Sequence, residues 1–162
     1  MSVDLRSGSS SRKPVDGSGL RVAIVSSVFN SAIVDNLVTG ARRALEAHGV
    51  RPDDVDVIWV PGALEIPQVA KVVAEARRHD AIVALGAVIK GDTYHFEVVC
   101  DASAAGLMHL SMVTDIVITN GILTVYDEEQ ARVRSGEDDR NKGYEVAMAA
   151  LETVVAVRSL SS

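Results

Sequence analysis

The stretch Ala81-Ile82-Val83-Ala84-Leu85, followed by Gly86, is the segment of the sequence that decides the fold. All five residues are apolar, with no polar residue between them. A continuous apolar run is the pattern of a parallel strand that is buried on both faces. Val22-Ala23-Ile24-Val25 has the same character. A β-branched and aromatic run over 55–60 and a short apolar run over 116–118 complete a set of four expected strands.

Segments with helical spacing of apolar residues separate these strands. The spacing predicts helices over 31–48, 66–78 and 96–109, with two more over 128–134 and 144–157 after the last strand. Strands that alternate with helices imply a parallel sheet covered by helices on both faces. The fold class expected is therefore α/β, a three-layer αβα sandwich around a four-stranded parallel sheet.

Length and composition indicate one globular domain. The chain has 162 residues, 48% of them hydrophobic and 23% charged, which are ordinary values for a folded protein. Its net charge of −6 argues against broad nucleic-acid binding, which needs a basic surface. Residues 1–19, nine of them Ser or Gly, predict a disordered tail, and residues 20–162 are expected to form the domain.

The composition also favours a cytoplasmic location and no membrane partner. Cys100 is the one cysteine, which excludes an intramolecular disulfide and is typical of a reducing compartment. No apolar run approaches the ~18 residues that span a bilayer. The beginning of the sequence lacks the apolar core of a secretory signal.

The richest polar segment follows the third strand, where ligands of parallel α/β folds bind. Lys90, Asp92, Thr93 and His95 stand within six residues, just before a helix. Free N–H groups at a helix start favour an anion such as phosphate, and His95 can exchange protons near pH 7. The alternative is that Asp92 or Thr93 merely caps the helix and that His95 is a surface residue.

Three further segments contain candidate ligand groups. Phe29, in a polar loop after the first strand, can stack on a planar ligand or simply pack over the end of the sheet. Glu65, between two prolines after the second strand, is either a binding group or a solvated loop acid. The stretch 132–142 contains arginines suited to phosphate, although a solvated loop of mixed charge is the simpler interpretation.

Signatures of common cofactors are missing from the sequence. No glycine motif of the dinucleotide-binding type follows the first strand, and no G-x-x-x-x-G-K-[ST] occurs. Neither H-E-x-x-H nor a pair of cysteines suggests a metal. We therefore expect neither a cofactor nor a metal ion.

Taken together, these segments resemble the lumazine synthase family. The similarity runs from about residue 21 to 158 without an obvious gap, and the blocks Val60–Pro67 and Gly91–Glu97 are specific as a pair, in order and in separation. The other matching stretches are Val28-Phe29-Asn30, Gly121-Ile122-Leu123-Thr124 with Glu128-Glu129-Gln130-Ala131, and Asn141-Lys142-Gly143.

The resemblance implies a flavodoxin-like fold and a transferase of riboflavin biosynthesis without metal or redox cofactor. Family members join 5-amino-6-ribitylaminouracil to 3,4-dihydroxy-2-butanone 4-phosphate in the penultimate step and form 6,7-dimethyl-8-ribityllumazine, phosphate and water. A pyrimidine amine attacks the ketone to give an imine, phosphate leaves by β-elimination, and the second amine closes the ring. The family forms pentamers with active sites between subunits, and some pentamers assemble into shells of sixty subunits.

The resemblance also assigns roles to residues of this sequence. His95 matches the general acid/base, Phe29 the stacking aromatic, and Arg134 the phosphate-binding arginine, with Lys142 at the edge of the same site. The other matching substrate-binding positions are Ala63, Leu64, Glu65, Ala87, Val88, Ile89, Asp92, Thr93 and Asn120.

Three positions depart from the family pattern. Asn120 stands where phenylalanine is common and makes the expected pocket wall more polar; Lys90 replaces a common arginine; Thr114-Asp115-Ile116 lacks a proline. The segment between Arg134 and Asn141 has no insertion of the kind associated with isolated pentamers, so a shell is allowed. The competing hypotheses are a flavin- or pyrimidine-binding module without activity and a structural protein that forms shells.

Overall fold

The chain forms a four-stranded, all-parallel sheet with strand order β2-β1-β3-β4. The computed structural model describes residues 14–138 and 140–161. Its strands are β1 (Val22–Ser27), β2 (Val55–Val60), β3 (Ala81–Ile89) and β4 (Val117–Val125). All four expected strands are present, and the predicted parallel sheet is confirmed.

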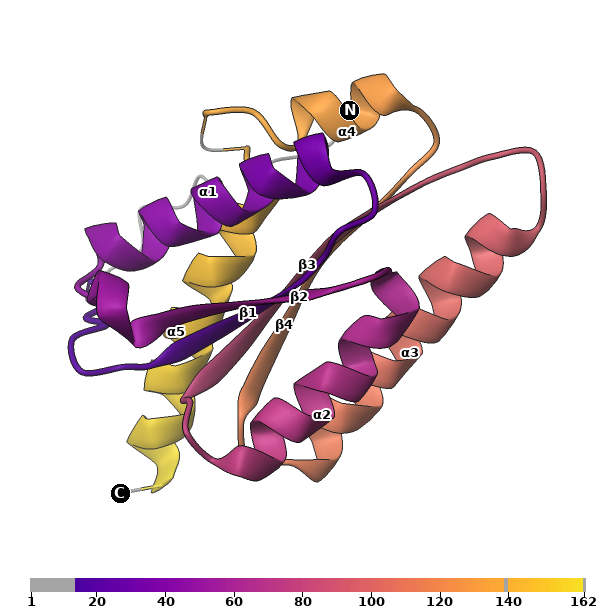
Figure 1. Ribbon diagram of the computed structural model, residues 1–162. Helices are drawn as coiled ribbons and strands as arrows, with labels where there is room; N and C mark the ends of the chain where they lie inside the picture. Colours follow the sequence, from indigo (N-terminus) through magenta and orange to yellow (C-terminus); the bar gives the residue numbers. More distant parts are fainter. Residues whose placement is uncertain (1–13, 139, 162) are drawn as a thin grey trace.

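Helices cover both faces of the sheet, as Figure 1 shows. One face packs against α1 (Ser31–Ala47) and α5 (Lys142–Ser161), with the short α4 (Glu128–Val133) near the start of α1. The other face packs against α2 (Ile66–Ala76) and α3 (His95–Val113). Two single turns of 3-10 helix, η1 (Pro52–Asp54) and η2 (Ala63–Glu65), flank β2. The three-layer αβα sandwich of flavodoxin-like type is confirmed.

The hydrophobic core is divided in two by the sheet, because successive side chains of a strand point to opposite faces. Val22 and Ile24 of β1 pack with α1 and α5, whereas Ala23 and Val25 pack with α2 and α3. All six residues of β1 are buried. Burial on both faces is the reason that the strand sequences are continuously apolar.

Strands β3 and β4 run beyond the ends that the sequence predicts. The expected ends were Gly86 and Ile118, but β3 continues to Ile89 and β4 to Val125, with Leu85 opposite Gly121 in the ladder. Glycine at 121 serves close packing and not a turn, because a Cβ there would lie 2.7 Å from side-chain atoms of both Leu85 and Val146. Residues 87–89 and 121–124 are therefore strand residues and not loop residues.

The predicted tail over residues 1–19 lies mainly outside the described residues, since the description begins at Pro14. In the described part, Val15 packs against the core on the α1 side. The Gly17 N–H donates to the His48 carbonyl at 2.6 Å.

Among the described residues, α3 is the one helix long and apolar enough to cross a membrane by length and composition, which is weak evidence by itself. In this structure α3 packs as a layer of the domain, through Val99, Ser103, Leu107 and Leu110. Its opposite face exposes three apolar side chains, Val98 (45%), Met108 (64%) and Met112 (78%), around the exposed Asp101.

We predict that Gly143→Ala destabilises the domain. A Cβ at this position, in the first turn of α5, would collide with the Leu37 carbonyl oxygen of α1. Overpacking typically costs ~1–3 kcal/mol, and we expect a loss near the upper end because the obstacle is backbone. Urea denaturation measures the loss, and Gly136→Ala, whose Cβ would meet nothing closer than 3.8 Å, is the control. Equal stability of the two variants would contradict the close approach of α1 and α5.

Candidate active site

A cavity of about 440 Å³ opens at the carboxyl end of the sheet, beside β1 and β3. Four segments from different parts of the chain form its wall, namely the β1–α1 turn, η2, the end of β3 and the first turn of α3. Its lining residues are Phe29, Asn30, Gly62, Ala63, Leu64, Glu65, Ala87, Val88, Ile89, Gly91, Thr93, His95, Phe96 and Val99. This is the edge at which ligands of parallel α/β folds bind.

The floor of the cavity is the free end of β3. The ladder between β1 and β3 ends at the pair Ser26–Leu85, although β3 continues to Ile89. On the β1 side, the backbone groups of residues 86–89 therefore have no strand partner. One of them, the Ala87 carbonyl, accepts a hydrogen bond of 2.8 Å from Asn30 Nδ2. Unpaired strand groups at the edge of a cavity can bind the edge of a planar polar ligand.

The β1–α1 turn presents Phe29 to the cavity. Asn30 occupies the left-handed region at φ 60°, which asparagine tolerates better than most residues, and its amide ties the turn to β3. The Phe29 N–H donates to the Pro61 carbonyl at 3.2 Å, which joins the turn to the end of β2. The Phe29 ring is 74% exposed, so it is available for stacking and does not cover the sheet end as a buried side chain.

The turn after β2 places Glu65 on the opposite wall. Gly62 precedes η2, and the Glu65 N–H donates to the Gly62 carbonyl at 3.2 Å. Pro67 then occupies the first turn of α2, where its missing N–H has no intrahelical partner to lose. Ala63 is buried, whereas Leu64 and Glu65 are exposed at the cavity.

The start of α3 is uncapped. Tyr94 is its N-cap residue, and no side chain in the described part of the chain makes a cap hydrogen bond there. The alternative that Asp92 or Thr93 caps the helix is therefore wrong. His95 is the first residue of this long helix and is exposed, and open space surrounds the position of a Cβ at Gly91. Uncapped N–H groups beside an open loop suit an anion.

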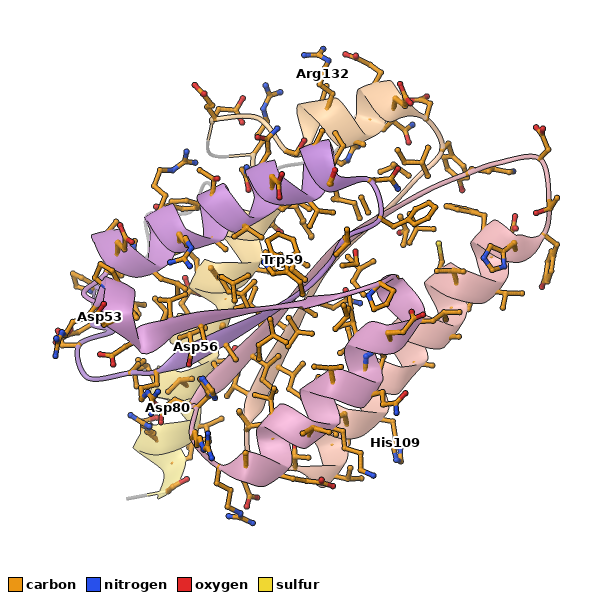
Figure 2. All side chains as sticks on the ribbon, viewed as in Figure 1. Asp53, Asp56, Trp59, Asp80, His109 and Arg132 are labelled. Carbon is orange, nitrogen blue, oxygen red and sulfur yellow. The ribbon has the colours of Figure 1, made fainter. Side chains whose placement is uncertain are left out.

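The cations of the 132–142 stretch differ in how they are paired. Arg132, which points away from the sheet in Figure 2, binds Glu129, and Arg140 binds Asp138. These hydrogen bonds lower the pKa of both carboxyl groups. Arg134 differs, because Nη1 donates to the Gln130 carbonyl at 3.1 Å and no carboxylate of the described residues lies within 4.0 Å of its guanidinium.

The short helix α4 that bears Arg134 has a reciprocal cap. The Asp127 side chain accepts from the Gln130 N–H at 2.8 Å, and Gln130 Oε1 accepts from the Tyr126 N–H at 2.8 Å. This arrangement is similar to a capping box and satisfies two backbone donors at once. It fixes the start of α4, and Arg134 is the C-cap residue at the end of the same short helix.

The structure brings nine of the predicted site residues to the cavity, and four lie elsewhere. The nine are Phe29, Ala63, Leu64, Glu65, Ala87, Val88, Ile89, Thr93 and His95. Asp92, Asn120, Arg134 and Lys142 are not among the lining residues. Asn120 lies exposed on the edge strand β4, where Oδ1 accepts from the Ile122 N–H at 2.9 Å. Lys142 Nζ lies 3.4 Å from Glu145 Oε1.

Sequence reasoning missed Asn30, Phe96 and Tyr126. Asn30 is visible in the sequence as a turn-forming residue, but its bond to Ala87 spans 57 positions. Tyr126 joins the two loops that follow β3 and β4, because its ring lies 6.1 Å from the Phe96 ring and 5.6 Å from Lys90 Nζ. Nothing in the spacing of the sequence signals that contact.

The described residues contain no cluster of three or more His, Cys, Asp or Glu side chains that could hold a metal ion. Cys100, on α3, is also poorly suited to nucleophilic chemistry. Partial burial raises the pKa of its thiol, and Asp101 and Glu97 raise it further. The polar groups at the cavity itself, His95 and Glu65 above all, are therefore the candidates for proton transfer and binding.

The fold and the cavity together define an α/β enzyme domain with a small-molecule site at the carboxyl edge of its sheet. Residues 19–158 match the family model of 6,7-dimethyl-8-ribityllumazine synthase. The chain belongs to this family.

Two relatives illustrate the similarity, and both are described as 6,7-dimethyl-8-ribityllumazine synthase. The protein from Leuconostoc mesenteroides subsp. mesenteroides is 47% identical over 150 residues, which cover 93% of this chain and 96% of the relative. The protein from Kosmotoga olearia is 46% identical over 146 residues, which cover 90% of this chain and 94% of the relative. The family resemblance predicted from the sequence is confirmed.

We predict that iodoacetamide alkylates Cys100 more slowly than free cysteine at pH 8. The thiolate is the reactive form, and burial together with Asp101 and Glu97 raises the pKa of this thiol. Asp101→Asn removes one of the two charges and is expected to speed the reaction, whereas Asp115→Asn, beyond the end of α3, is the control. A rate equal to that of free cysteine would contradict this account of the thiol.

Proposed function

We propose that this chain condenses 5-amino-6-ribitylaminouracil with 3,4-dihydroxy-2-butanone 4-phosphate to 6,7-dimethyl-8-ribityllumazine, with release of phosphate and water. It acts as a transferase in the penultimate step of riboflavin biosynthesis. The observation that carries the proposal is the cavity at the end of β3, where Phe29, Glu65 and His95 of distant segments meet. Family membership supplies the identity of the reaction.

The pyrimidine lies between Phe29 and the end of β3. A planar heterocycle gains from stacking on the exposed ring, and its polar edge needs hydrogen-bond partners. The backbone of Ala87 and Ile89 faces the side without a β1 partner and supplies them, while Val88 lines the same wall of the cavity. Ala63, Leu64 and Glu65 on the opposite wall bind the ribityl chain.

The phosphate end of the second substrate lies at the start of α3. Thr93 lines the cavity, Asp92 is next to it, and the N–H groups of the first helical turn are uncapped. His95, on that same turn, moves protons during imine formation and elimination. A positioned general acid/base typically contributes ~10²–10⁴-fold, and the remainder comes from holding two reactants together.

The site is completed by a neighbouring copy of the chain. Asn120, Arg134 and Lys142 do not line the cavity of their own chain, yet Arg134 lacks a carboxylate among the described residues. In a homo-oligomer these side chains face the cavity of the next copy, where Arg134 binds phosphate and Lys142 flanks it. Asn120, whose amide nitrogen makes no hydrogen bond to the described residues, forms a polar wall.

The exposed apolar face of α3 supports the same assembly. Val98, Met108 and Met112 would leave apolar surface in water on an isolated chain, and such patches mark protein interfaces. We propose a homopentamer with its sites between neighbours, as the family resemblance implies, and the short segment between Arg134 and Asn141 is compatible with a shell of sixty subunits. We place the protein in the cytoplasm, in keeping with its single thiol.

We predict that His95→Ala slows turnover by ~10²-fold without abolishing it, since positioning of the two substrates is retained. The lumazine absorbs and fluoresces, so its formation from both substrates gives the rate directly. The uncatalysed reaction is the reference, and His109→Ala, an exposed histidine elsewhere on α3, is the matched control. Complete loss of activity in a folded variant would contradict the view that holding the two substrates together contributes to catalysis.

We predict that Arg134→Ala raises the KM for the butanone phosphate more than the KM for the pyrimidine. Loss of a charge-assisted hydrogen bond costs ~1.5–3 kcal/mol, equivalent to a rise of roughly 10- to 150-fold. Arg132→Ala, which removes a cation already bound to Glu129, is the control and leaves both constants nearly unchanged. Equal losses for the two substrates would refute the phosphate role.

The product assay also separates enzyme from binding module. A folded wild-type chain that binds the pyrimidine but forms lumazine no faster than background would support the inactive module and count against the enzyme. Particle size, measured by light scattering, separately tests the pentamer and the shell.

A further inference from the structure

We propose that Asn141 is a positioning residue that sets the placement of Arg134 and Lys142 for binding of the substrate phosphate. The inference rests on the proposed function of those two cations. Asn141 is 2% exposed, and it is one of the few polar residues that are buried in the described part of the chain. It directly precedes Lys142, the first residue of α5.

The Asn141 amide makes three hydrogen bonds. Nδ2 donates to the Gly136 carbonyl at 2.8 Å and to the Asn36 carbonyl at 3.1 Å, while Oδ1 accepts from the Tyr144 N–H at 3.1 Å. The two acceptors and the donor fix which amide atom faces which partner, because a flip would oppose like groups. Buried bonds of this kind hold a side chain in one orientation.

These bonds join three parts of the chain at one point. Asn36 belongs to α1, Gly136 to the loop after α4, and Tyr144 to the first turn of α5. The Oδ1 bond caps α5. The two Nδ2 bonds tie the loop and the start of α5 to α1.

The same point fixes the backbone of the two cations. The Lys142 N–H donates to the Arg134 carbonyl at 2.8 Å, so the main chains of these residues are neighbours although eight positions separate them. Asn141 anchors that pair to α1, an element of the rigid sandwich. Without the two Nδ2 bonds, the hydrogen-bonded pair would remain, but the loop after α4 would lose its polar link to α1.

Gly40 leaves room for this amide. A Cβ at Gly40 would collide with the Asn141 amide atoms. A glycine in the middle of α1 is unfavourable for the helix by roughly 1 kcal/mol relative to alanine. We infer that glycine stands at this position because it leaves space for the Asn141 side chain. Gly40 gives a second way to disturb the amide from another element.

Asn141→Ser is the central test. Serine is a good N-cap and keeps an oxygen for the start of α5, but it cannot reach both Asn36 and Gly136. We expect the KM for the butanone phosphate to rise roughly tenfold, below the ~10²-fold cost of a 1 Å misplacement. The KM for the pyrimidine should change little. Gly40→Ala, which displaces the amide without touching either cation, should have the same selective effect.

Thr119→Val is the matched control. It removes another hydrogen bond between α5 and the rest of the domain, from Thr119 Oγ1 to the Val146 carbonyl at 3.0 Å, and should lower stability while leaving both KM values unchanged. Calorimetric titration with inorganic phosphate adds a reading that does not depend on turnover. Weaker phosphate binding is expected for Asn141→Ser and Gly40→Ala, but not for Thr119→Val.

The outcomes distinguish a failure of the proposed function from a failure of the positioning role of Asn141. If the wild type forms no lumazine, the proposed function fails, and phosphate titration still judges the role of Asn141. If the wild type is active and Arg134→Ala raises the phosphate-substrate KM while Asn141→Ser and Gly40→Ala leave it unchanged, the positioning inference is overturned. If Asn141→Ser raised the KM values of both substrates equally, the inference would also be overturned. Asn141 would then only stabilise the fold.

Discussion

The end of β3 is the constraint on which the rest of the site depends. Four residues of this strand, 86–89, continue past its last pair with β1 while they remain paired with β4. The strand is thus rigid on one side and has free backbone groups on the other. The turns after β1 and β2 close over the free side, and α3 begins beside it. The cavity is the consequence of one central strand being longer than its neighbour.

The charges at this edge are divided between two surfaces. The cavity holds the aromatic ring, the carboxylate and the histidine, whereas Arg134 and Lys142 belong to the region where α4 and α5 are tied to α1. Each surface is held by its own amide, Asn30 at the cavity and Asn141 at the cations. Under the proposed function, the two surfaces form one site where two copies of the chain meet. Burial of the exposed apolar side chains of α3 would stabilise an interface between copies of the chain.

Much of the fold could be predicted from the sequence, because burial on both faces leaves a continuous apolar pattern and helices leave a period of 3.6. The strand ends could not. The apolar runs predict that one strand ends at Gly86 and another before Gly121, but both glycines lie within strands where close packing excludes a side chain. The candidate residues after each strand could be found because ligands of parallel α/β folds bind at the carboxyl ends of the strands. Asn141 received no role from spacing, since its bond to Asn36 spans 105 positions.

The division of the site between two copies is tested most directly by mixing two impaired variants, each altered on a different side of the proposed site. Co-expression of His95→Ala chains with Arg134→Ala chains gives mixed oligomers. Random mixing restores an intact site at roughly a quarter of the interfaces, where the His95 side and the Arg134 side both come from unaltered surfaces. We predict lumazine formation clearly above the sum of the two separate variants. Activity no greater than that sum, in oligomers shown to be mixed, would contradict a shared site.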